Sequence, residues 1–226
     1  MHNSNYIVLD AARMGMNIET AKELNPDFKC LFQGKTELEL AGVAPFLFTY
    51  SSNIEFKQWF EKLSIGNSWG VSFHSHLPFI EIYKHCRRFL IVKNAGEQEI
   101  YFRFYDPRVL RIFLPTCSRS QLNDFFGPIN SFLVEDENPD FLLKFTFDNI
   151  RLFINRFARI DFHNEHENKD TLNQQATDTI IEKDDSPTQI VSINKAIFND
   201  HSTIDPSKKT PSVSDSNNKW NKFYFD

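Results

Sequence analysis

A group of histidine and cysteine residues in this sequence has a spacing that could form a metal-binding site. His74 and His76 alternate along a predicted strand, so their imidazoles would project to one face, and His85 or Cys86 could complete a zinc site. Two or three imidazoles near a turn, however, are more often ordinary surface or core histidines. We therefore expect no metal and no other cofactor.

The common sequence motifs of enzymes are absent. The chain has no GxSxG nucleophile elbow, no HExxH zinc motif and no glycine-rich phosphate loop, and only 7 of its 226 residues are glycine. The adjacent Arg87 and Arg88 could bind an anion, but an ion pair with Asp10 or Asp106 explains them equally well. We predict no catalytic residue and a function that is not enzymatic.

The most informative stretch predicts a strand followed directly by a helix. Ile100–Tyr105 alternates apolar and polar residues, as half-buried strands do. Asp106 can cap a helix that begins at Pro107, where a missing backbone N–H costs nothing. Arg103, Asp106 and Arg108 would meet at this junction, with Arg108 free to leave the body. Two interpretations stay open: a purely structural corner, or a corner that also contacts a partner.

The remaining elements are predicted from hydrophobic periodicity, capping residues and turn residues. The predicted strands are Tyr6–Leu9, Phe28–Phe32, Phe46–Tyr50, Trp69–Phe73, Phe89–Val92, Ile129–Val134 and Phe141–Phe147. The predicted helices are Met16–Leu24, one capped by Ser52 or Asn53, Pro78–His85, one with a Ser118 capping box, and one capped by Asp148 with a stripe of Ile150, Phe153, Ile154, Phe157 and Ile160. The irregular alternation predicts a mixed α/β (α+β) single domain, with a mixed sheet and flanking helices.

Composition divides the chain into a packed body and a polar tail. Of the 33 aromatic residues, 28 precede His163, and the segment from His163 onward carries −4 of the net charge of −5. We expect an α/β domain over residues 1–135, a strand and an amphipathic helix over 136–162, and a flexible tail over 163–226. The tail ends in the aromatic cluster Trp220–Phe225, which could pack on the body or dock elsewhere.

Charge and hydropathy exclude several kinds of partner. The body is close to neutral, so no basic surface of the kind that binds nucleic acid is expected. No apolar run is long enough to span a bilayer, and no signal peptide is visible. Cys30, Cys86 and Cys117 are odd in number and widely spaced, which suits buried thiols in a reducing compartment. A soluble cytoplasmic protein that binds neither nucleic acid nor membrane is expected.

Several short motifs, in this order and spacing, resemble a known family. They are Leu9-Asp10-Ala11-Ala12-Arg13, Cys30-Leu31-Phe32-Gln33-Gly34, Ala44-Pro45-Phe46-Leu47, Trp69-Gly70-Val71, His85-Cys86-Arg87-Arg88-Phe89-Leu90, Phe102-Arg103-Phe104-Tyr105-Asp106-Pro107-Arg108-Val109-Leu110 and Phe125-Phe126-Gly127-Pro128. The pattern is similar to that of the type VI secretion effector chaperones or adaptors, over about residues 5 to 130. Its most specific piece is the stretch from Phe102 to Leu110 together with the upstream Arg87-Arg88-Phe89-Leu90.

The resemblance implies a non-enzymatic cytoplasmic protein that binds one secreted effector, keeps it soluble and helps to load it onto the VgrG spike. The effector's N-terminal region is the expected contact. The motif positions are Arg88, Arg103, Tyr105, Asp106 and Arg108, and we assign them as candidate partner-binding residues that serve the fold, the partner surface or both.

Two other classes of function stay open at this stage. An immunity protein that binds and neutralises a toxin would also be small, acidic and non-catalytic. An enzyme with an unrecognised site is the other class, and a metal bound to the purified protein would reveal it.

Overall fold

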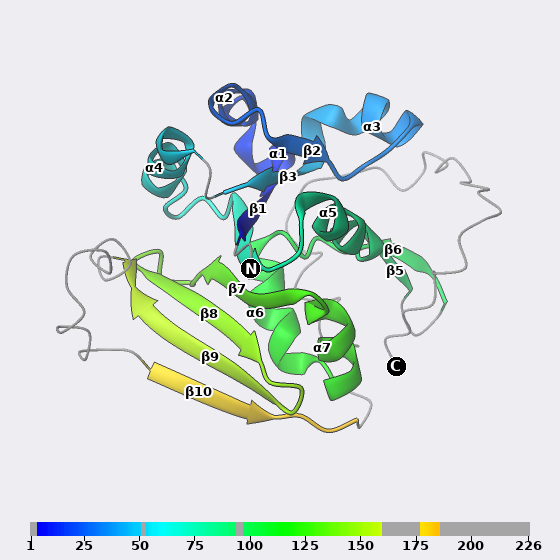
Figure 1. Cartoon of the computed structure of the whole chain (residues 1–226), viewed down its shortest axis with the longest axis vertical. Helices are drawn as coiled ribbons and strands as arrows, with labels where there is room; N and C mark the ends of the chain where they lie inside the picture. The colour runs from blue at the N-terminus through cyan, green and yellow to red at the C-terminus, as the bar shows by residue number, and fades with distance from the viewer. Residues whose placement is uncertain (1–3, 51–52, 94–96, 160–176, 186–226) are drawn as a thin grey trace.

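An antiparallel sheet of eight strands organises the fold. The computed structural model describes residues 4–50, 53–93, 97–159 and 177–185 (Figure 1). The strand order is β10-β9-β8-β7-β4-β1-β3-β2, and every neighbouring pair among these strands is antiparallel. The bounds are β1 Ser4–Asp10, β2 Phe28–Cys30, β3 Pro45–Thr49, β4 Gly70–Ser75, β7 Ile129–Glu135, β8 Phe141–Phe147, β9 Arg151–Ala158 and β10 Thr177–Glu182.

Helices and a short hairpin complete the described fold. The helices are α1 Ala11–Met14, α2 Asn17–Leu24, α3 Lys35–Leu40, α4 Ile54–Leu63, α5 Phe79–Arg88, α6 Pro107–Thr116 and α7 Arg119–Phe126, with a 3-10 turn η1 at Ala41–Val43. The strands β5 Ile91–Lys93 and β6 Glu99–Tyr101 pair with each other. Figure 1 shows this hairpin beyond the end of α5, apart from the large sheet.

Strand β1 separates two hydrophobic cores because successive side chains point to opposite faces. Tyr6 and Val8 belong to a core built with α5, α6 and α7, whereas Ile7 and Leu9 belong to one built with α1, α2 and α4. All four side chains are almost completely buried. The sheet is therefore covered on both faces around β1, and the predicted mixed α+β class is confirmed.

Local capping signals in the sequence correctly predict three helix starts. Asn53 accepts a hydrogen bond from the Phe56 N–H, and Asp106 accepts one from the Arg108 N–H. Ser118 and Gln121 form the predicted reciprocal capping box of α7. Each of these signals lies within a few residues of the backbone group that it satisfies, so it does not depend on tertiary contacts.

The predicted amphipathic helix after Asp148 is wrong, because this segment is strand β9. Asp148 accepts hydrogen bonds from the Ile150 and Arg151 N–H groups, and Asn149 has a φ of 72°, which makes a tight β8–β9 turn. Leu152 lies off the predicted helical stripe, yet it is the completely buried residue of this strand. Isoleucine and phenylalanine favour strands, and pairing with β8 and β10 decides the outcome.

Other boundaries also differ from the predictions. Helix α5 continues to Arg88, so the predicted central strand Phe89–Val92 is reduced to β5, which lies in the separate hairpin. Its predicted partner Ile100–Tyr105 ends at Tyr101, after which the chain turns. Strand β10 comes from the segment that was predicted to be a flexible tail and extends the sheet beside β9. The aromatic cluster Trp220–Phe225 lies outside the described residues.

Candidate functional site

Two buried aspartates occupy the N-caps of two helices at one corner of the fold. Asp10 ends β1 and accepts a hydrogen bond of 3.0 Å from the Ala12 N–H of α1. Asp106 accepts one of 3.0 Å from the Arg108 N–H of α6. Their relative exposures are 0% and 1%. Burial of two carboxylates so close together requires compensating positive charge.

Two arginines supply that charge. The Arg103 guanidinium donates to Asp10 Oδ2 at 2.5 Å and lies 3.7 Å from Asp106 Oδ2. Arg108 binds Asp106 in a bidentate manner, with Nε 3.1 Å from Oδ1 and Nη2 2.8 Å from Oδ2. We call Asp10, Arg103, Asp106 and Arg108 the aspartate–arginine corner. Its two negative and two positive charges cancel.

Burial shapes the ionisation of this corner. It raises the pKa of Asp10, and the facing charge of Arg103 opposes that shift. Burial disfavours the charged Arg103 guanidinium, but the charge and hydrogen bond of Asp10 outweigh this effect and raise the pKa of Arg103. Tyr105 is buried beside the corner, and burial together with the Asp10 charge raises the pKa of its hydroxyl. The Tyr105 hydroxyl therefore stays protonated and neutral within the core.

The structure brings four of the five candidate site residues together and leaves one apart. Arg103, Asp106 and Arg108 meet at the corner, as the sequence predicts, and Tyr105 is buried beside them. The expectation that Arg108 leaves the body is wrong, because its guanidinium turns back onto Asp106. Arg88 lies at the end of α5, exposed to solvent, with its guanidinium 5.6 Å from the centre of the Phe89 ring.

Asp10 is the member of the corner that was not among the predicted site residues. It is separated from Arg103 by 93 positions, so only the tertiary fold places the two together. The sequence does carry one local signal, since an aspartate at the end of an apolar strand and before Ala-Ala-Arg suits an N-cap.

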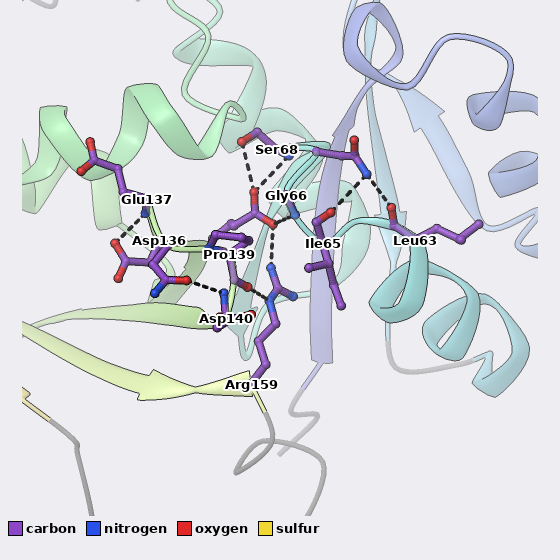
Figure 2. A network of polar contacts seen from close by, with 12 residues as sticks. Leu63, Ile65, Gly66, Ser68, Asp136, Glu137, Pro139, Asp140 and Arg159 are labelled. Atoms are coloured by element: carbon purple, nitrogen blue, oxygen red, sulfur yellow. Dashed lines mark hydrogen bonds and ion pairs between the residues drawn. The ribbon is translucent and has the colours of Figure 1, made fainter.

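A second polar cluster was not predicted at all and lies where β7 and β9 end near the α4–β4 loop. Glu135 accepts hydrogen bonds from the Gly66 N–H at 2.8 Å, from the N–H and hydroxyl of Ser68 at 3.2 Å each, and from Arg159 at 2.7 Å. Figure 2 shows Arg159 reaching toward this loop and toward Pro139, whose carbonyl it binds at 2.6 Å. We call Glu135, Arg159, Gly66 and Ser68 the Glu135 clasp.

A small pocket adjoins the clasp. Its volume of about 50 Å³ has room for a few water molecules. Tyr50 and Glu61 line it together with Ser68, Glu135 and Arg159. The Tyr50 hydroxyl donates to Glu61 at 3.2 Å. Burial and the Glu61 charge raise the pKa of Tyr50, so its hydroxyl stays protonated. The clasp connects three segments of the chain. In the part of the chain that is described, every buried side-chain nitrogen or oxygen atom has a hydrogen-bond partner.

The histidines and cysteines do not form a metal centre within the described residues. His85 is buried, and its Nε2 donates to the Phe125 carbonyl at 2.9 Å, while burial lowers its pKa to about 4. Burial also raises the pKa values of Cys30, Cys86 and Cys117. These groups therefore pack as neutral core residues. Among the described helices, none has the length and apolar character needed to cross a membrane.

Comparison with known proteins identifies a family but no individual relative. No curated protein and no solved structure was found to match the chain. A family model described as "Domain of unknown function (DUF4123)" matches residues 5–124. This range contains the whole aspartate–arginine corner and Arg88, whereas the two charged residues of the clasp, Glu135 and Arg159, lie beyond it. Because the matched range is more than half of the 226 residues, the chain belongs to this family of domains of unknown function.

Proposed function

We propose that this chain is an adaptor that binds one secreted effector of a type VI secretion system, keeps it soluble and helps to load it onto the VgrG spike. The single observation that carries the proposal is the family match over residues 5–124, because this family is associated with adaptors that load type VI effectors. Six of the seven motifs that carry the resemblance, from Leu9 to Leu110, lie inside the matched range, and the seventh, Phe125–Pro128, lies just beyond it.

The geometry of the motif is consistent with a protein that works by presenting a surface. The aspartate–arginine corner fixes the starts of α1 and α6 and holds them against β1. Its four charged side chains pair with one another, and these ion pairs hold the two helix starts in fixed positions. A preorganised body of this kind reduces the ordering cost of binding a partner.

Co-expression with candidate effectors tests the proposal. The probes are the products of large reading frames next to this chain's gene, each also expressed as an N-terminal half and a C-terminal half. We expect the chain to copurify with one full-length effector and with its N-terminal half, and to increase the soluble fraction of both. An effector encoded beside an unrelated secretion cluster is the control and should not copurify.

The same experiment separates the adaptor from an immunity protein. An immunity protein would bind the toxic half of its target and abolish its activity, whereas an adaptor bound at the N-terminal half would leave that activity intact. Addition of the neighbouring VgrG protein should then give a three-component complex on size exclusion. Retention only on the toxic half, with inhibition, would contradict the adaptor proposal.

A further inference from the structure

A second group of basic and apolar side chains lies outside the corner, where β2, the end of α5 and the β5–β6 hairpin meet. We call Lys29, Phe32, Arg87, Ile91 and Tyr101 the basic aromatic patch. Ile91 and Tyr101 are directly opposite each other in the hairpin and are 46% and 50% exposed. Such a half-exposed apolar cross-strand pair presents a contiguous surface to solvent, unlike a single scattered apolar residue.

Contacts connect the members of the patch. The Tyr101 ring lies 6.1 Å from the ring of Phe32, measured between centroids. Arg87 Nε donates to the Leu31 carbonyl at 3.0 Å, beside Phe32. The guanidinium of Arg87 lies 5.7 Å from the centre of the Tyr83 ring, and Lys29 Nζ lies 4.5 Å from the same ring. Tyr83 therefore holds both cations next to the apolar residues.

The two cations of the patch are not held in ion pairs by the part of the chain that the structure describes. Within the described residues, neither Lys29 nor Arg87 forms an ion pair with a carboxylate, whereas the nearby Lys93 is paired with Glu97 at 3.0 Å. This concentration of positive charge lies in a chain whose net charge is −5.

We propose that the basic aromatic patch binds an acidic segment of the effector that carries one aromatic or large aliphatic anchor. The proposal rests on the proposed adaptor function and assigns the surface that recognises the partner. Lys29 and Arg87 would face carboxylates, while Phe32, Ile91 and Tyr101 would surround the anchor. Aromatic and arginine side chains contribute strongly to protein interfaces, and complementary charge selects the partner.

Site-directed crosslinking identifies the segment that contacts the patch. A benzophenone amino acid is placed at Tyr101 and, as a matched control, at Ile54, which is 64% exposed on α4. The probe is the N-terminal half of the effector that copurifies with the chain. We expect crosslinks from position 101 to a segment with net negative charge and none from position 54. Crosslinks from position 101 to a second copy of the chain, or to a basic segment, would overturn the proposal.

Paired substitutions measure the contribution of the patch. Lys29→Glu with Tyr101→Ser should weaken binding of that effector fragment by about tenfold or more. The matched control, Lys62→Glu with Ile54→Ser on α4, should leave the dissociation constant within about twofold. Binding by the unaltered chain should also weaken as salt is raised from about 50 to 300 mM, and Lys29→Glu should reduce that dependence. Lys29→Glu alone serves if the double variant does not fold, since Lys29 is exposed.

The outcomes distinguish this inference from the function on which it rests. If the unaltered chain binds no effector half, the adaptor function fails and the inference fails with it. If the unaltered chain binds and the folded patch variants bind equally well, only the inference is overturned. Weaker binding in the patch variants together with unchanged binding in the α4 variants supports both.

Discussion

The aspartate–arginine corner and the basic aromatic patch use the same kind of side chain for opposite purposes. At the corner, Arg103 and Arg108 lie within 4 Å of buried carboxylates that neutralise them. At the patch, Arg87 and Lys29 lie over the Tyr83 ring, and within the described structure neither has a carboxylate partner. The arginines of the corner are therefore neutralised by carboxylates of the same chain, whereas the two cations of the patch contact an aromatic ring instead.

This difference bears on how a sequence motif is interpreted. The motif stretch from Phe102 to Leu110 is the most specific part of the resemblance, yet its charged side chains mainly contact one another and Asp10. A residue that fixes a helix start is constrained by the fold whatever partner the protein binds. We therefore propose that partner recognition depends on residues outside the corner.

The largest expected effect follows from removing the acid at the centre of the corner. Asp106→Ala deletes the cap of α6 and leaves Arg103 and Arg108 without this carboxylate. A broken buried pair and a lost cap together should lower the free energy of unfolding by about 4 kcal/mol. Chemical denaturation of the purified variant, followed by tryptophan fluorescence, measures this change.

Asp148→Ala is the matched control for this prediction. Asp148 also bonds to a backbone N–H and to the guanidinium of a following arginine, Arg151, but at an exposed turn. Water can replace its contacts, so we expect a much smaller loss of stability. Equal losses in the two variants would mean that burial does not distinguish the corner from an ordinary surface pair.

Glu135 and Arg159 of the clasp form a buried ion pair outside the matched family range. Their substitution therefore tests whether burial alone makes the loss of an ion pair strongly destabilising. Arg159→Met leaves Glu135 with its three donors from Gly66 and Ser68 but without a positive charge, and should lower the free energy of unfolding by about 3 kcal/mol. The double variant with Glu135→Gln should lose less than the sum of the single variants, because the two side chains interact directly. Stability losses that add exactly would contradict a direct interaction between Glu135 and Arg159.

The sequence predicts features of this fold that depend on neighbouring residues. The caps Asn53, Asp106 and Ser118 are correct because each satisfies backbone groups within three residues. The meeting of Arg103, Asp106 and Arg108 is correct for the same reason. Strand β9 was predicted as a helix because its apolar residues recur at helical spacing, and pairing with β8 and β10 overrides that local pattern.

Contacts between distant residues could not be predicted from local patterns. Asp10 reaches Arg103 across 93 positions, and Arg159 reaches Glu135 across 24. Both contacts depend on the order and register of the strands, which a residue pattern does not specify. The basic aromatic patch likewise requires the hairpin to lie beside Phe32, a contact that no local pattern predicts. Of its cations, the sequence singles out Arg87 alone, as a possible anion-binding residue next to Arg88.

The buried side chain of His85 on helix α5 predicts a pH dependence of stability. The pKa of His85 is about 4, below the ordinary 6.5, so the folded protein resists protonation of this side chain. Its contribution to stability is therefore complete above about pH 6.5 and is lost progressively as the pH falls toward 4. At pH 4.5 the loss should be about 2 kcal/mol relative to pH 7.5.

His85→Gln isolates this titration from that of the carboxylates. The amide can still donate to the Phe125 carbonyl but does not ionise in this range. Unfolding free energies of both proteins are measured at intervals from pH 7.5 to 4.5. We expect the gap between the unaltered chain and the variant to shift in favour of the variant as the pH falls. Parallel curves would show that His85 is protonated as easily in the folded protein as in the unfolded chain.

The smallest expected effect is on the stability of the patch variant. Lys29→Glu with Tyr101→Ser removes an exposed cation and a half-exposed ring, so its free energy of unfolding should change by less than about 1 kcal/mol. Comparison with Asp106→Ala under the same denaturant conditions then separates the two regions directly, because we expect a large loss of stability at the corner and a small one at the patch. A loss of about 3 kcal/mol or more in the patch variant would place Tyr101 in the core. In that case the two regions would both support the fold, and the division between a structural corner and a recognition surface would not hold.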